Sequence, residues 1–216
     1  MTRRSPSKAR QENSDEAAVR ERILDAAFAA FMKTGYAAAS TLEIATRARV
    51  SKRELYALVG NKQEILIECI RARATRLKVP ADLPVPHDRE TLAQVLTSFG
   101  TQLLREITDP MVVTVFRLAI ADAVRAPEVA RALDSIGREA SRAALRQIMT
   151  QGQTSGLLTG RPPELAEQFG GLLWGNLLIS LLLGVAERPS SREIATRARD
   201  ATAALLQLHP GSSSTI

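Results

Sequence analysis

Residues 40–62 read STLEIATRARVSKRELYALVGNK, and this stretch decides the fold. It contains three helix-start signals, in each of which a capping residue is followed three positions later by glutamate: Ser40 with Glu43, Ser51 with Glu54, and Asn61 with Glu64. In a capping box, the first side chain accepts a hydrogen bond from a free backbone N–H of the first turn, and the glutamate accepts one from the N–H of the capping residue. One such match is weak, but three at intervals of ten or eleven residues are hard to obtain by chance.

The three signals predict two short helices, about 41–48 and 52–58, and a longer one, about 62–78. Two short helices joined by a tight turn bury little apolar surface alone, so they need a third helix beneath them. The preceding segment supplies it, because apolar residues recur at helical spacing over about 16–34 and Gly35 follows as a left-handed cap. The arrangement is typical of a helix-turn-helix, which places its second helix in the DNA major groove.

Within this unit, three apolar residues have distinct expected places. Ala45 is the small residue where the two short helices approach, Val50 fills the core beneath the turn, and Leu55 points inward from the second helix. The hydrophobic content of 45% suits a globular protein, and the expected fold class is all-α because no apolar run alternates at period two as a strand does.

The rest of the chain is divided by prolines, glycines and one more capping box, Ser190 with Glu193. The helices expected there run from the cap Asp88 to about 107, over about 110–125 and 127–151, from Pro162 to about 186, and from Ser190 to about 208. About nine helices are expected in all. The predicted organisation is a flexible basic arm over 1–14, a DNA-binding domain with its connecting helix over 15–78, a linker over 79–88, a helical ligand-binding and dimerisation domain over 89–209, and a disordered tail over 210–216.

Positive charge is concentrated in the first third of the chain. Residues 1–78 contain 16 Lys and Arg against 9 Asp and Glu, whereas residues 79–216 contain 13 against 14. A basic module joined to a near-neutral one favours a polyanion partner for the first module, although a solvated basic surface gives the same pattern. The single cysteine, Cys69, excludes an internal disulfide framework, and no apolar stretch follows the N-terminus as a signal peptide requires, so we expect a cytoplasmic protein.

The apolar and turn residues of this region resemble the TetR family of transcriptional regulators. The resemblance covers about 23–70 and is carried by Ile23-Leu24-Asp25-Ala26-Ala27, Phe31, Gly35-Tyr36, Ile44-Ala45, Ala48-Arg49-Val50-Ser51-Lys52, Leu55-Tyr56, Lys62 and Ile65-Leu66. Residues 117–133 weakly resemble the C-terminal domain of an AefR-like branch. The resemblance implies a dimeric, all-helical protein that represses its target until a small molecule binds the C-terminal domain. It also implies phosphate contacts for Thr41, Tyr56 and Lys62, and a recognition helix over 51–58.

The sequence departs from the family pattern at three positions. Arg49 stands where the family usually has glycine, and a left-handed conformation there would cost roughly 1–2 kcal/mol relative to glycine. Glu54 replaces a common threonine; it stabilises the helix as a cap partner, and facing DNA it would repel phosphate or accept from cytosine N4. Val59 replaces a usual phenylalanine and thins the core.

The expected DNA contacts lie on the two short helices and at the start of the third. Lys52 and Arg53 open the recognition helix, where side chains reach base edges, and the other interpretation of each is exposed charge on a helix. The full set of DNA-binding candidates is Thr41, Arg47, Ser51, Lys52, Arg53, Glu54, Tyr56 and Lys62. Arg3, Arg4, Lys8 and Arg10 of the N-terminal arm either follow the DNA or are merely disordered.

Two further sets of candidates lie in the C-terminal part. Residues 169–186 carry no formal charge, which favours a helix buried between a ligand domain and a subunit interface over a membrane span. The expected dimer interface comprises Gly171, Gly175, Ile179, Leu183, Ile194, Ala198, Ala201 and Leu205. The candidate ligand pocket comprises Phe99, Met111, Phe116, Arg117, Asp122, Trp174 and Asn176, and ordinary core packing is the other interpretation of each. His87 and His209 have no metal-ligand partner at useful spacing, so we expect no metal and no cofactor.

The sequence therefore predicts a homodimeric, sequence-specific DNA-binding transcriptional regulator, a repressor released from a palindromic operator of double-stranded DNA by a small apolar effector. A sequence-tolerant DNA-compacting protein is the first alternative. A helical enzyme is the second, and it is poorly supported because the chain has no glycine-rich phosphate loop, no Cys/His pair and no close carboxylate pair on an apolar face. No membrane partner is expected.

Overall fold

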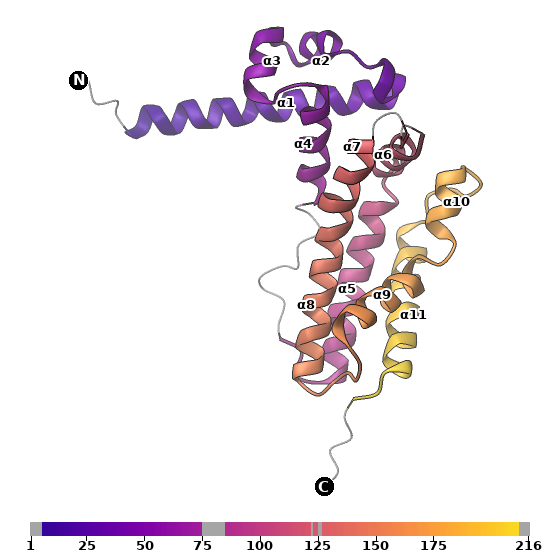
Figure 1. The fold of residues 1–216 in the computed structure, drawn as a ribbon. Coiled ribbons are helices and arrows are strands. Elements are labelled where there is room, and N and C mark those ends of the chain that lie inside the picture. The colour runs from indigo at the N-terminus through magenta and orange to yellow at the C-terminus, as the bar shows by residue number, and fades with distance from the viewer. Residues whose placement is uncertain (1–5, 75–84, 122, 125–126, 212–216) are drawn as a thin grey trace. The chain divides into compact units, whose positions relative to one another are not determined.

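The computed structural model describes residues 6–74, 85–121, 123–124 and 127–211, and these residues form helices and connections without a strand. The helices, labelled in Figure 1, are α1 (Pro6–Ala38), α2 (Thr41–Ala48), α3 (Lys52–Leu58), α4 (Lys62–Ala74), α5 (Arg89–Ile107), α6 (Pro110–Ala121), α7 (Pro127–Ala132), α8 (Glu139–Thr154), α9 (Pro162–Trp174), α10 (Leu177–Leu183) and α11 (Ser191–Leu208). The chain forms two compact units, the first comprising residues 1–72 and 118–133 and the second residues 73–117 and 134–216. The all-α prediction is confirmed.

The predicted helix starts are found where the capping signals lie. Full capping boxes begin α3 at Ser51, α5 at Asp88 and α11 at Ser190. Asn61 likewise accepts from the N–H of Glu64 while its own N–H donates to the Glu64 carboxylate. At Ser40 the hydroxyl accepts from the N–H of Glu43 at 3.1 Å, which is the first half of the box. These bonds are local, which is why the sequence alone predicted them.

The cap of α11 also changes the acidity of one carboxyl. The hydroxyl and the backbone N–H of Ser190 both donate to Glu193, and these bonds hold the pKa of Glu193 below its usual value. The ionised form is therefore the one that supports this helix start.

Helix α1 begins earlier than the sequence predicted. It starts at Pro6, within the segment for which we expected a flexible arm, and the expected start near residue 16 is wrong. The physical reason is that proline suits a first helical turn and the residues after it, SKARQENS, contain no helix breaker. The expected contacts of Arg3 and Arg4 lie outside the described residues. Near the other end, Gly35 has φ 81° and ψ 165°, a conformation that only glycine adopts readily, so α1 is kinked there rather than closed by the left-handed cap that we predicted.

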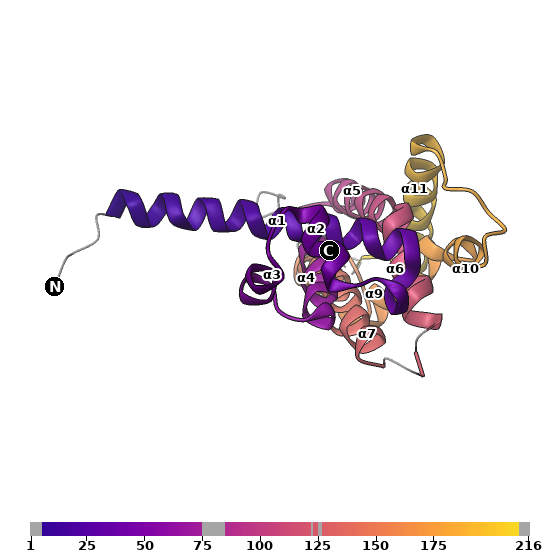
Figure 2. The ribbon, with the colours of Figure 1, turned by 90° about the horizontal axis from the view of Figure 1, so that it is seen from above.

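The first unit is built on the C-terminal half of α1. Helices α2 and α3 lie over that half, while the N-terminal part of α1 extends beyond them (Figure 2). The core beneath them consists of fully buried side chains: Ile23, Phe31, Ile44, Leu55 and Ile65. Cys69 is also fully buried, as expected of a small apolar residue. Val50 is only half-buried, so it contributes less to this core than we predicted.

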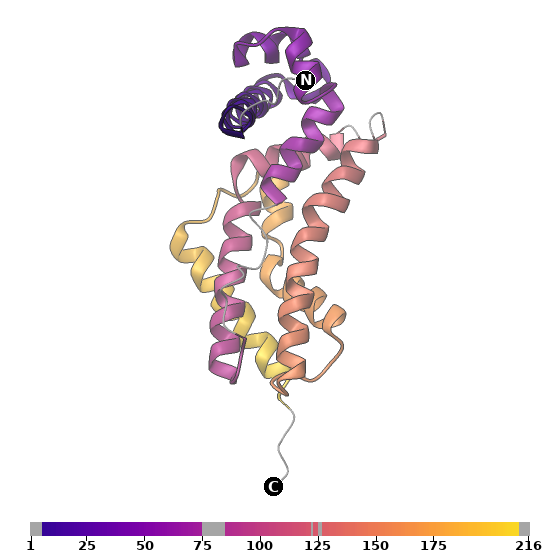
Figure 3. The same ribbon diagram turned by 90° about the vertical axis from the view of Figure 1, so that its left-hand side faces the viewer.

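In the second unit, α5 packs against α11 and α8 packs against α9 (Figure 3). Arg89 holds the lower end of the unit together, because its guanidinium donates to the carbonyls of Leu157, Leu206 and His209. The core residues come from all of these helices, among them Leu96, Phe99, Ile148, Phe169 and Leu205.

The single helix expected from Pro162 to about residue 186 is in fact two. Gly175 has φ 45° and ψ −130°, and α9 and α10 meet there with a bend of 52°. Glycine adopts this conformation readily, whereas a residue with a side chain would resist it. The helix expected over the apolar run is therefore interrupted at Gly175, just before Asn176. No single described helix is both long and apolar enough to cross a bilayer; the bent pair α9–α10 satisfies length and composition only when the two are taken together.

Two other boundaries differ from expectation. Helix α6 ends at Ala121 rather than about 125, and the helix expected over 127–151 consists of α7, a π-helical turn over Leu133–Arg138, and α8. Most of the predicted linker 79–88 and of the tail 210–216 lies outside the described residues.

The packing of α11 corrects the prediction for four of the eight expected dimer-interface residues. Ile194, Ala198, Ala201 and Leu205 are buried in the core of their own chain, because α5 covers that face of the helix. An apolar stripe on a helix shows that something covers it. Here the cover is another helix of the same chain.

Candidate nucleic-acid interface

The turn between α2 and α3 is a left-handed one, centred on Arg49. This residue has φ 56° and ψ 46° and is the one described residue other than glycine with a positive φ. The N–H of Arg49 donates to the carbonyl of Thr46 at 3.2 Å, and the N–H of Val50 donates to that of Ala45 at 3.0 Å. The turn is therefore held by these backbone hydrogen bonds, and arginine adopts a conformation that costs an L-residue free energy.

Helix α3 presents its basic residues to solvent. Leu55 is 0% exposed and fixes the inner face of the helix against α1 and α2, whereas Lys52 and Arg53 are exposed on its first turn. Ser51 accepts from the N–H of Glu54 at 3.0 Å, and the Glu54 carboxylate accepts from the N–H of Ser51 at 3.4 Å. Of the two roles considered for Glu54, the structure shows that of cap partner.

Thr41 and Tyr56 bring the start of α2 to the middle of α3. The Thr41 hydroxyl lies 3.3 Å from the Tyr56 hydroxyl, and the Lys52 ammonium lies 5.9 Å from the centre of the Tyr56 ring. Tyr56 is 44% exposed, so this phenol is at the surface rather than in the core. A threonine, a tyrosine and a lysine thus form one polar surface, with hydroxyl and ammonium donors of the kind that contact DNA phosphates.

Lys62 is placed differently from expectation. Its ammonium donates to the carbonyls of Tyr36, Ala37 and Ala39 at 2.8, 3.1 and 3.1 Å, and it lies 4.7 Å from the centre of the Tyr36 ring. The last carbonyls of a helix have no partner within the helix and carry partial negative charge. Lys62 therefore caps the C-terminal end of α1, and its ammonium group is already hydrogen-bonded to acceptors of the same chain.

This geometry predicts a loss of stability when the ammonium is removed. Lys62→Met keeps the apolar stem but leaves three carbonyls without their donor, and we expect the free energy of unfolding of the first unit to fall by about 1–3 kcal/mol. Thermal unfolding followed by circular dichroism measures this, and Lys33→Met, at an exposed position on α1, is the control and should change little. Wild-type stability combined with weaker DNA binding would instead show that Lys62 contacts phosphate.

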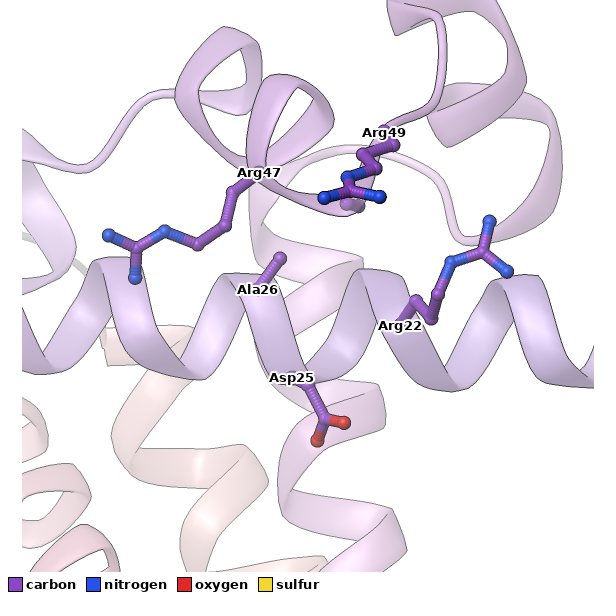
Figure 4. Close-up of a pocket in the computed structure, with 6 residues that line it drawn as sticks. Arg22, Asp25, Ala26, Arg47 and Arg49 are labelled. Carbon is purple, nitrogen blue, oxygen red and sulfur yellow. The ribbon is translucent and has the colours of Figure 1, made fainter.

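Two arginines that sequence analysis did not assign to the site lie beside the turn. Arg22 from α1 and Arg49 from the turn line an open hollow together with the predicted contact Arg47 (Figure 4). No sequence pattern connects Arg22 with this site, since it lies 25 residues before Arg47. Arg49 did give a signal, because arginine stands where a left-handed turn favours glycine.

The ligand-pocket candidates are not gathered at one described hollow. Phe99 is buried in the core of the second unit, and Trp174 packs against that core, which is ordinary core packing. Arg117 donates to the carbonyls of Leu181 and Leu182, so it closes the end of α10. Met111 and Phe116 are half-buried on α6, Asn176 is exposed, and Asp122 lies outside the described residues.

The remaining dimer candidates are exposed. Ile179 and Leu183 of α10 are 62% and 71% exposed, and Val185 beyond them is also exposed. A Cβ placed at Gly171 meets no atom of the described chain within 4 Å, so a second helix can approach there. The face from Gly171 to Val185 is an apolar surface, which we call the α9–α10 face.

Two family models match this chain. Residues 23–69 match the description "Bacterial regulatory proteins, tetR family", and residues 94–208 match "AefR-like transcriptional repressor, C-terminal domain". A curated relative, the uncharacterised HTH-type transcriptional regulator YvkB of Bacillus subtilis (strain 168), is 25% identical over 164 residues, which cover 76% of this chain and 84% of YvkB.

Solved structures of the same kind cover nearly the whole chain. A putative TetR-family regulator from Mesorhizobium loti MAFF303099 is 26% identical with a TM-score of 0.75, covering 90% of this chain and 98% of that one. A TetR regulator from Agrobacterium tumefaciens is 26% identical with a TM-score of 0.76, covering 89% and 95%. The flavonoid-responsive regulator FrrA is 27% identical with a TM-score of 0.71, covering 90% and 98%.

Proposed function

This chain belongs to the TetR family of transcriptional regulators and is a DNA-binding regulator rather than an enzyme, and from that premise we propose that it is a repressor that leaves a palindromic operator when a small apolar effector binds. The observation that carries the proposal is the first turn of α3. Lys52 and Arg53 project into solvent there because Leu55 anchors the opposite face of the helix. Arginine paired with guanine is the commonest specific contact in the major groove.

Further contacts to the DNA backbone come from neighbouring residues. Thr41, Tyr56 and Ser51 present hydroxyls around the recognition helix, and Arg47 adds an exposed guanidinium at the end of α2. Such contacts set the position of a protein on the duplex, while base contacts select the sequence. In this proposal Glu54 stabilises the start of α3 as a cap partner and contacts no DNA base.

The repressor and effector parts of the proposal rest on similarity and on the second unit. The C-terminal match is described as that of a transcriptional repressor, and FrrA is described as flavonoid-responsive. The half-buried Met111 and Phe116 of α6 supply apolar surface for an effector in the second unit. An effector can release the operator only if it binds the two states of the protein with different affinity.

A palindromic operator requires two copies of the protein. We infer that two chains pair through the α9–α10 face, since large apolar residues there are exposed and the exposed Gly171 leaves room for close approach. Two recognition helices would then bind half-sites about one helical turn apart, or a multiple of it. The proposed place of action is the cytoplasm.

The experiment that tests the function is footprinting on DNA fragments selected for binding from a random pool. We expect one protected palindrome and a steep negative dependence of affinity on salt, with a slope of roughly 0.9 per phosphate contacted. Addition of apolar aromatic compounds to the bound complex should release the DNA in at least one case. Binding that is indifferent to sequence at every salt concentration would favour the alternative, a DNA-compacting protein, and would overturn the proposal.

A further inference from the structure

Three arginines surround one open hollow in the first unit. It has a volume of about 680 Å³ and is lined by Arg22, Asp25 and Ala26 of α1, and by Arg47, Ala48 and Arg49 at the end of α2. Ala26 and Ala48 are buried and form its floor. Because both are small, they leave space where larger side chains would fill the angle between α1 and the turn.

Within the described part of the chain, the arginines of this hollow are not paired with a carboxylate. Among the residues that the structure describes, none of the three guanidinium groups has a hydrogen-bond acceptor or a carboxylate within ion-pair distance. Asp25 also lines the hollow, but its carboxylate is turned away from Arg47 and Arg49 (Figure 4). Other arginines of the same unit do find partners, since Arg20 and Arg71 both pair with Glu68. Three like charges around one space favour an anion.

The backbone of Arg49 adds a second, independent observation. Its left-handed conformation is costly for arginine and would cost glycine little. Strained conformations of this kind tend to persist where the side chain has a function. The side chain of Arg49 lies in the hollow between those of Arg47 and Arg22 in the view of Figure 4.

We propose that Arg22, Arg47 and Arg49 form a phosphate-binding pocket that holds a backbone phosphate of DNA next to the bases met by α3. This inference deepens the proposed function and rests on it. Guanidinium groups bind phosphate oxygens through paired, charge-assisted hydrogen bonds, and the two non-bridging oxygens of a phosphodiester can accept from more than one guanidinium. The hollow is open to solvent and adjoins the turn that leads into α3, three residues before Lys52, so a phosphate on a polymer chain can enter it.

Arg49→Gly gives the sharpest test, because it moves stability and binding in opposite directions. Glycine relieves the left-handed residue, so the thermal midpoint should rise by about 2–8 °C. The affinity for operator should nevertheless fall about tenfold, the affinity for unrelated DNA should fall by the same factor, and the salt slope should drop by about 0.9 per bound protomer. A folding defect cannot explain a more stable protein that binds less well.

A second variant and a matched control complete the experiment. Arg47→Gln removes a guanidinium from a helical residue and should reproduce the lower slope without the gain in stability. Lys33→Gln removes the same charge from an exposed position eleven residues after Arg22 on α1, and it should leave the slope unchanged. Operator DNA in which single phosphates are replaced in turn by neutral methylphosphonates then locates the bound phosphate. At that position the arginine has no charged partner, so wild type and Arg49→Gly should bind equally well.

Titration with inorganic phosphate distinguishes DNA from a free anion as the occupant. If Arg49→Gly keeps the wild-type affinity and salt slope for DNA, the inference fails, although the regulator function stands through α3. If the wild type binds inorganic phosphate at the hollow and the variant does not, while DNA binding is equal in both, the occupant is a free phosphate and the DNA assignment is overturned.

Discussion

Replacement of both Lys52 and Arg53 by alanine is expected to abolish operator recognition while leaving the fold intact. Both side chains are exposed on the first turn of α3, and neither contributes to the core that Leu55 anchors. Even a single good base contact on each of two protomers, at roughly 1–3 kcal/mol each, amounts to about 2–6 kcal/mol, so affinity should fall by at least roughly 30-fold. Fluorescence anisotropy with the footprinted operator measures this loss.

The matched control for this variant removes the same charge from the same unit. Lys33 and Arg71 are exposed on α1 and α4, and Arg71 forms only a surface ion pair with Glu68, which contributes little. The Lys33→Ala/Arg71→Ala protein should bind the operator nearly as the wild type does. Equal losses in both double variants would mean that general charge, and not recognition by α3, controls binding.

The second large effect is expected at the α9–α10 face. In the single chain, the side chains of Ile179 and Leu183 are 62% and 71% exposed. The double variant Ile179→Asp/Leu183→Asp places two carboxylates on each chain at these positions, and therefore four across a symmetric interface. Charges facing one another at an interface cost several kcal/mol, so we expect the dimer dissociation constant to rise by at least about 100-fold. Sedimentation should show a monomer, and operator affinity should fall because a single protomer meets one half-site.

A control variant tests whether aspartates placed on any exposed apolar surface would also dissociate the dimer. Ile120 and Val124 are also exposed and apolar, but they belong to the first unit. Ile120→Asp/Val124→Asp should remain dimeric. A dimer that survives both pairs of substitutions would show that the chains pair through another surface, and the assignment of the α9–α10 face would be withdrawn.

Several features of the site could be predicted from sequence because they depend on neighbours only a few residues away. The boundaries of α2 and α3 follow from caps that join a residue to the third one after it. The inward side of Leu55 follows from the helix-turn-helix pattern, whereas a left-handed conformation at Arg49 is expected only from the resemblance, because the family usually has glycine there. The start of α1 at Pro6 does not follow from composition, because a polar, basic segment suits a disordered arm as well as a helix.

The tertiary structure decided which partner each local pattern meets. The stripe of α11 with Ile194 and Leu205 predicted burial correctly, but only packing showed that α5 covers it rather than a second chain. Lys62 and Tyr36 lie 26 residues apart, so periodicity could not reveal that the ammonium closes α1. Arg22 and Arg49 come together for the same reason: helical spacing fixes the face on which a side chain lies, whereas the way distant segments pack fixes what lies opposite it.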